Sequence, residues 1–171
     1  RTERGRFILT IFERRVAHSD LPFFMDLMGF LSGEGICCPV PIVAKDGQAL
    51  VQLHGKPAAV LSHLPGTSIS EPTLRHCGLV GSMLANVHNA SLNFSGGRSN
   101  SLTLKDWPNL LKQIGAEGDL VSPGITADLE DEIQYLSGHW PEDLPQGVIH
   151  GDLFPDNVLF FDGKISGVID F

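Results

Sequence analysis

The spacing of hydrophobic residues changes along the chain between the short period of strands and the longer period of helices. Runs rich in β-branched and aromatic residues, bounded by turn formers, predict strands at 6–13, 49–53, 57–62 and 147–149 and a hairpin of 158–161 with 164–169 around Asp162-Gly163. Apolar residues three and four apart predict helices from Asp20 to Gly33, over 71–91 and 106–113, and around Leu129, Ile133, Leu136 and Trp140. These elements predict an α+β fold.

The order of the elements indicates two lobes. Strands and one helix come first, and mostly helices with a late hairpin follow. Leu64-Pro65-Gly66 interrupts the pattern between them. We therefore expect an N-terminal lobe at 1–61, a hinge at 62–66 and a C-terminal lobe at 67–171. Because strand-like runs lie next to both ends, we also expect a chain that is cut at both ends.

Composition narrows the class of protein. The 171 residues are 42% hydrophobic and 19% charged, as in ordinary globular domains. A net charge of −8 argues against a nucleic-acid partner, which needs a basic surface. No apolar run approaches the roughly 20 residues that span a bilayer. The cysteines, Cys37, Cys38 and Cys77, lack the spacing of a disulfide framework or a metal site, so we expect a cytoplasmic protein without a membrane partner.

The segment from His150 to Asn157, followed by Asp170 at the end of the last strand, carries the candidate chemistry. It contains His-x-Asp, an asparagine five positions after that aspartate, a hairpin and a second aspartate. This layout is typical of a kinase catalytic loop followed by a metal-binding aspartate. We expect Asp152 to accept the proton of the acceptor hydroxyl, Asn157 and Asp170 to bind Mg²⁺ beside ATP, and His150 to fix the path of the loop.

A plainer interpretation treats the same residues as loop formers, because Asp, Asn, Gly and Pro all favour turns. The context favours the kinase interpretation. An apolar run precedes His150, and Asp170 stands inside Val168-Ile169-Asp170-Phe171, where a carboxylate without a partner is costly.

At these residues the chain resembles the aminoglycoside-phosphotransferase-like kinases, relatives of the protein kinases with the same two-lobed fold. The motif H-G-D-x-x-x-x-N and the later I-D-F both match, as does the helix motif G-x-x-L-A-x-x-H at 81–88. The segment 61–66 is similar to the hinge of that family, so the resemblance implies that Ser62, His63 and Leu64 hold the adenine. Within the family the passages 7–13, 20–24 and 139–157 resemble the homoserine kinases, which implies L-homoserine as the small-molecule substrate.

Two departures accompany the resemblance. The strand lysine that pairs with the ATP phosphates in most kinases of this fold corresponds here to Thr10, and Arg14 and Arg15 are weak substitutes. The nucleotide-covering loop and the substrate-side helices are expected outside residues 1–171. Other acceptors therefore stay open, namely an aminoglycoside, a choline-like alcohol or methylthioribose. A catalytically inactive nucleotide-binding module stays open as well.

Overall fold

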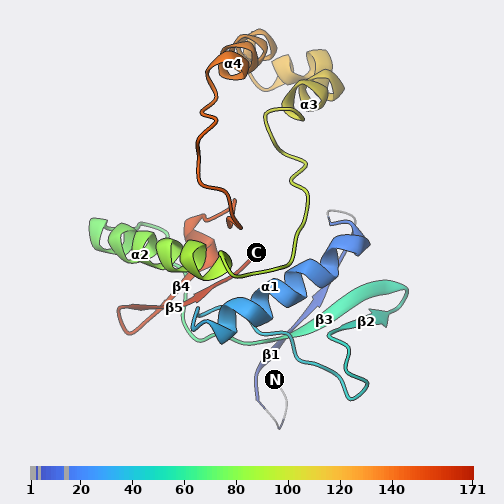
Figure 1. Cartoon of the computed structure of the whole chain (residues 1–171), viewed down its shortest axis with the longest axis vertical. Coiled ribbons are helices and arrows are strands. Elements are labelled where there is room, and N and C mark those ends of the chain that lie inside the picture. Colours follow the sequence, from blue (N-terminus) through green and yellow to red (C-terminus); the bar gives the residue numbers. More distant parts are fainter. Residues whose placement is uncertain (1–2, 4, 14–15) are drawn as a thin grey trace. The chain divides into compact units, whose positions relative to one another are not determined.

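The computed structural model describes residues 3, 5–13 and 16–171. The chain forms two compact units (Figure 1), Arg1–Gly97 together with Gly147–Phe171, and Arg98–Gln146. The larger unit contains every candidate site residue named above. Its elements in chain order are β1, η1, α1, β2, β3, α2, η3, β4 and β5.

A three-stranded antiparallel sheet forms one part of the larger unit. The strands are β1 (Phe7–Ile11), β2 (Leu50–Leu53) and β3 (Lys56–Ser62), in the order β1-β3-β2. The central strand has small residues where the packing is tightest, since Ala58 and Ala59 are both fully buried. All three strands lie where the sequence predicted them.

Helix α1 (Leu21–Gly33) packs between the sheet and the rest of the larger unit. The short η1 (His18–Asp20) precedes α1, and α1 has a proline in its first turn. One set of its side chains, with Met25 and Met28, packs in a cluster with the central strand of the sheet. Another set, with Leu27 and Leu31, packs against α2. Burying a side chain of this kind contributes about 1.5–3 kcal/mol, so α1 stabilises both halves of the unit.

Helix α2 (Leu74–Ser91) begins at a capping box, in which Thr73 and His76 satisfy each other's backbone N–H groups. Its apolar stripe reaches the core mainly near the C-terminal end, where Val87 is buried. Cys77 lies on the same stripe but is exposed. The helical spacing was therefore confirmed, and the stripe is buried only in part.

The hairpin near the C-terminus consists of β4 (Val158–Phe161) and β5 (Lys164–Val168). Its turn residues Asp162 and Gly163 have φ angles of 50° and 70°. Two consecutive positive φ angles are typical of the turn that joins two-residue hairpins. The sequence signal for this hairpin is thus confirmed.

The strand predicted at 147–149 does not form. No described strand pairs with these residues, and Gly147 lies in a bend. Val148 instead packs against the cluster between α1 and α2, and its carbonyl accepts a long hydrogen bond of 3.5 Å from Ser91. The apolar run at 147–149 therefore reflects the packing of Val148 and not membership of a sheet.

The smaller unit is helical. It contains α3 (Trp107–Ile114), η2 (Gly115–Leu120) and α4 (Ile125–His139). Trp107 and Trp140 meet edge to face at 5.7 Å between ring centroids. Both helices were predicted, and the content of helices and strands confirms an α+β fold. Among the described residues, no helix combines the length and the apolarity needed to cross a bilayer.

Candidate active site

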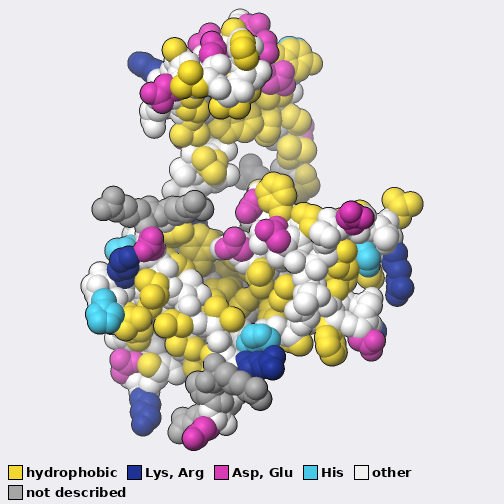
Figure 2. Space-filling view, turned by 180° about the vertical axis from the view of Figure 1, so that it is seen from behind, with side chains coloured by type: hydrophobic (Ala, Val, Ile, Leu, Met, Phe, Trp, Pro, Cys, Tyr) yellow, Lys and Arg dark blue, Asp and Glu magenta, His cyan; other side chains and the backbone are white. Residues whose placement is uncertain are grey.

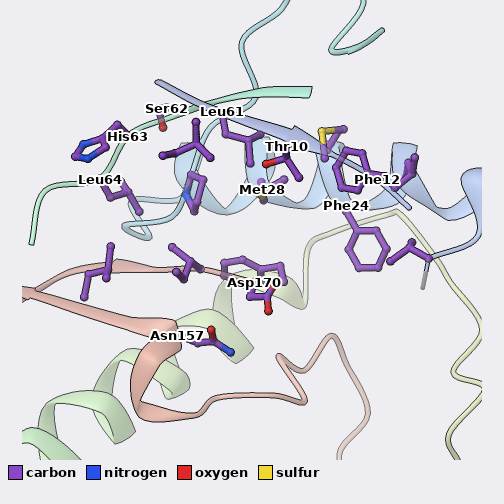
Figure 3. Close-up of a pocket in the computed structure, with 18 of the residues that line it drawn as sticks. Thr10, Phe12, Phe24, Met28, Leu61, Ser62, His63, Leu64, Asn157 and Asp170 are labelled. Atoms are coloured by element: carbon purple, nitrogen blue, oxygen red, sulfur yellow. The ribbon is translucent and has the colours of Figure 1, made fainter. Parts of the chain in front are cut away.

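A pocket of about 590 Å³ lies between the sheet with α1 on one side and the hairpin on the other (Figure 3). It belongs entirely to the larger unit. In Figure 3, His63 and Leu64 lie at one end and Phe12 and Phe24 at the other, with Asp170 between them on the hairpin side. The pocket thus joins residues that are far apart in the sequence.

The predicted hinge supplies one end of this pocket. Two groups of Ser62 are engaged with Val40, since its N–H donates to the Val40 carbonyl at 2.8 Å and its hydroxyl accepts from the Val40 N–H at 2.8 Å. His63 and Leu64 follow and line the pocket. The backbone of Leu64 lies beyond the paired part of β3 and makes no hydrogen bond to any residue that the structure describes. Its N–H and carbonyl are therefore available to a planar polar ring such as a purine.

His150 ties the catalytic loop to the end of the hairpin. Its Nε2 lies 2.9 Å from the carbonyl oxygen of Ile169, and its Nδ1 lies 3.3 Å from the backbone nitrogen of Asp152. A carbonyl can only accept and a backbone N–H can only donate, so the ring carries its proton on Nε2. The ring also packs against Phe171, at 4.9 Å between centroids. His150 therefore fixes the loop without lining the pocket.

Asp152 is held by its backbone and leaves its carboxylate uncommitted. Its carbonyl accepts from the Asn157 side chain at 2.7 Å and from the Phe154 N–H at 2.9 Å. The residue is exposed, and its carboxylate bonds to no other described residue. It does not line the pocket of Figure 3. A free carboxylate on a fixed loop is the arrangement that a proton acceptor for a bound alcohol requires.

Asn157 and Asp170 both line the pocket. Asn157 ends η3 (Pro155–Asn157) and is 8% exposed. Because its side-chain nitrogen donates to the Asp152 carbonyl, its amide oxygen is the group left for a ligand. Figure 3 shows the two side chains on the hairpin side of the pocket.

The backbone at Asp170 has an unusual conformation, with φ of 67°. Such a conformation costs about 1–3 kcal/mol in a residue with a side chain and persists only where the surroundings hold it. Here the preceding residue is fixed on both sides, since the Ile169 N–H donates to the Asn157 carbonyl at 3.0 Å and the Ile169 carbonyl accepts from His150. The strain places the Asp170 carboxylate at the pocket.

The wall opposite the hairpin is largely apolar. Thr10 of β1 lines it where kinases of this fold carry a lysine, and no Lys or Arg is among the described lining residues. Arg14 and Arg15 lie outside the described residues. Met25 and Met28 of α1 pack with the sheet and also line the pocket. The three-residue spacing places both on one face of a helix, but it does not reveal that this face ends at a cavity.

The donor atoms in the pocket suit a hard cation held mainly by a substrate. No group of three or more His, Cys, Asp or Glu side chains converges anywhere in the described part of the chain. Mg²⁺ commonly takes one or two protein oxygens, with water and phosphate oxygens completing its shell. An amide oxygen and a carboxylate at Asn157 and Asp170 fit that requirement.

The fold and the site define a class of phosphoryl-transfer protein, and the chain belongs to it. The model of the phosphotransferase enzyme family matches residues 1–171. The chain is 50% identical over 173 residues to the homoserine kinase of Gluconacetobacter diazotrophicus, covering 100% of this chain and 54% of that protein. It is 48% identical over 170 residues to the homoserine kinase of Allorhizobium ampelinum, covering 99% and 53%. The chain thus spans about half the length of the curated relatives it matches.

Solved structures show the same fold. The chain matches amicoumacin kinase hAmiN in complex with AMP-PNP, Ca²⁺ and Ami with a TM-score of 0.71 and 18% identity, covering 98% of this chain and 53% of that one. An aminoglycoside phosphotransferase from Alicyclobacillus acidocaldarius gives a TM-score of 0.60 at 14% identity, covering 98% and 57%. The family resemblance and the kinase-like fold expected from the motifs are confirmed.

Proposed function

We propose that the protein containing this chain transfers the γ-phosphoryl group of ATP to the side-chain hydroxyl of L-homoserine. The product would be O-phospho-L-homoserine, an intermediate of threonine biosynthesis. One observation carries the proposal: a single pocket joins the hinge residues Ser62 to Leu64 with the oxygen ligands Asn157 and Asp170. The catalytic-loop carboxylate of Asp152 is fixed to the same Asn157.

The residues divide into a binding group and a reacting group. The hinge backbone at Ser62, His63 and Leu64 holds the adenine, with the apolar wall of the pocket covering the ring. Asn157 and Asp170 would hold Mg²⁺, which would neutralise negative charge on the phosphates of ATP. We also propose that the domain boundaries lie at this hinge, with lobes at 1–61 and 67–171 joined by residues 62–66.

Chemistry takes place at the acceptor oxygen. That oxygen attacks the γ-phosphorus, the bond between the γ-phosphorus and the bridging oxygen breaks, and ADP leaves. Asp152 accepts the hydroxyl proton, and His150 keeps the Asp152 backbone in place through its Nδ1. Positioning of this kind supplies much of the catalysis in phosphoryl transfer.

The choice of homoserine rests on the curated relatives. Eight of them, each 46–50% identical and covering 99–100% of this chain, are homoserine kinases. The alternative acceptors are an aminoglycoside, a choline-like alcohol or methylthioribose. They stay open because the solved structures with the same fold include kinases other than homoserine kinases. We further propose that the protein works in the cytoplasm, where ATP is available.

Release of ADP tests the proposal in the full natural protein that contains this chain. With Mg·ATP, L-homoserine should stimulate release, and the alternative acceptors should not. If another acceptor alone stimulates it, the homoserine assignment is wrong. If no acceptor does, an inactive nucleotide-binding module becomes the better description.

Replacement of Asp152 tests the catalytic assignment. Asp152→Ala should lower kcat by about 10²–10⁴-fold, the usual cost of losing a positioned base, while the affinity for Mg·ATP stays unchanged. Asp131→Ala, at an exposed position of α4, is a matched control for loss of a carboxylate. Full activity of Asp152→Ala would remove this residue from the mechanism.

A further inference from the structure

The segment that follows the hinge is bound to the hairpin that carries the metal ligands. Thr67 and Phe160 exchange two backbone hydrogen bonds, at 3.1 and 2.9 Å. The Ser166 hydroxyl donates to the Pro65 carbonyl at 2.5 Å. Three hydrogen bonds therefore connect both strands of the hairpin to residues 65–67.

Two glycines permit this close approach. A Cβ atom on Gly66 would lie 2.7 Å from the carbonyl oxygen of Phe160, and φ at Gly66 is 114°. A Cβ atom on Gly167 would contact Leu64, lying 3.2 Å from its Cβ and 3.3 Å from its Cγ and closer still to its Cδ1. Gly167 has no positive φ, so alanine there is compatible with the backbone and conflicts only with Leu64.

We propose that Ser166 and Gly167 are positioning residues, which set where the hinge holds the nucleotide base. Gly167 leaves room for Leu64 beside β5, and the Ser166 hydroxyl holds Pro65 there through its hydrogen bond. Strand β5 leads directly to Asp170. This inference rests on the proposed nucleotide site and adds to it the residues that align its two ends.

The residue that contacts the hinge and the proposed metal ligand are close along the chain. Gly167 and Asp170 are three residues apart, so extended chain between them spans at most about 10 Å. Leu159, the partner of Gly167 in the hairpin, also lines the pocket. The base end and the metal end of the site are therefore built on the same pair of strands. Movement between lobes must bend the chain before Pro65, because the chain from Pro65 onwards is fixed to the hairpin.

The chemistry of the site predicts which step a perturbation affects. Displacing Leu64 alters contacts with the base, which are made equally before and during the reaction, so it weakens binding without slowing the chemical step. The Asp152 loop and the metal ligands stay where they are. A general loss of structure would instead lower kcat together with the affinity.

The experiment measures ATP kinetics and adenosine binding in the full natural protein. Gly167→Ala should raise KM for ATP about tenfold and change kcat less than about twofold. Calorimetry should show a matching loss of affinity for adenosine, a probe that lacks the phosphates. With Leu64→Ala already present, adding Gly167→Ala should raise KM by much less than tenfold, because the closest conflicting atom Cδ1 and the Cγ are gone and only the Cβ at 3.2 Å remains.

Gly78→Ala is the matched control, since Gly78 lies on the exposed side of α2 with nothing within 4 Å of an added Cβ. It should leave KM and kcat unchanged. If Gly167→Ala does not fold, Ser166→Ala decides instead, with KM for ATP rising about threefold through loss of one hydrogen bond.

Three results would overturn the inference. An unchanged KM in Gly167→Ala, or in Ser166→Ala where that variant decides, contradicts the positioning role while the wild type still binds Mg·ATP. A fall in kcat at constant KM contradicts it equally. Absence of Mg·ATP binding by the wild type overturns the proposed function and this inference together.

Discussion

Asn157 connects the candidate catalytic loop to the proposed metal site, and two substitutions separate these roles. Its side-chain nitrogen donates to the Asp152 carbonyl at 2.7 Å, and its amide oxygen is available to the cation. Asn157→Ala removes both groups. Asn157→Asp keeps an oxygen ligand but removes the donor to the loop.

The cost in stability follows from the partners that remain. In Asn157→Ala the Asp152 carbonyl still accepts from the Phe154 N–H at 2.9 Å, so no buried group loses its last partner. The free energy of unfolding should fall by about 1 kcal/mol, the usual net value of one hydrogen bond. Asn157→Asp brings a carboxylate against the same carbonyl and should cost about 1–3 kcal/mol.

Function separates the two variants further. Asn157→Ala should bind AMP-PNP with a clearly weaker dependence on Mg²⁺, since Asp170 alone remains as a protein ligand, whereas Asn157→Asp should retain the full dependence. Both should lose about 10²-fold in kcat, because the Asp152 loop loses one of the hydrogen bonds that position it. Urea unfolding and calorimetry with and without Mg²⁺ measure these quantities, with Asn89→Ala on the exposed face of α2 as the control. If Asn157→Ala keeps the Mg²⁺ dependence of the wild type, Asn157 is not a metal ligand.

Three further predictions concern stability and reactivity. Leu31 is fully buried, so Leu31→Ala should lower the free energy of unfolding by about 2–5 kcal/mol in urea titrations, and a loss below about 0.5 kcal/mol would contradict its place in the core. Burial, with the neighbouring Cys37 adding to it, raises the pKa of the Cys38 thiol to about 11, so iodoacetamide near neutral pH should modify the exposed Cys37 much faster, as tandem mass spectrometry can show. Equal rates would refute the burial of Cys38. Hydrogen bonds from Thr103 lower the pKa of Asp106 below its ordinary 3.8, so this stabilisation is present above that pH and is lost below it. Asp106→Asn should therefore lower the thermal midpoint at about pH 7 and by progressively less as the pH falls below 3.8, and an effect independent of pH would contradict the assignment.

Features decided by local chemistry could be predicted from the sequence. The turn at Asp162-Gly163 requires positive φ at two positions, and this residue pair tolerates it, so the hairpin was evident. Helix α1 carried both a start signal and a regular apolar spacing. The motif at 150–157 located the candidate catalytic loop for the same reason, because its residues act as one short segment.

Features decided by distant contacts could not be predicted. Cys77 has the spacing of a core residue, but exposure depends on whether another element covers that part of α2. On the face seen in Figure 2, many hydrophobic side chains are exposed, so apolar character alone is a poor guide to burial in this protein. Gly167 illustrates the same limit, since only the approach of Leu64 from far along the chain gives this glycine its role.

The pocket also constrains how the protein acquires its shape during synthesis. Its walls come from residues up to Gly66 and from Asn157 onwards. About ninety residues must therefore be synthesised after the first wall before the second can meet it. The sheet and α1 can form soon after they leave the ribosome, but with their ligand-facing surface still open to water. Until the hairpin is made, this apolar wall stays exposed to water, and transiently exposed apolar surface of this kind favours aggregation.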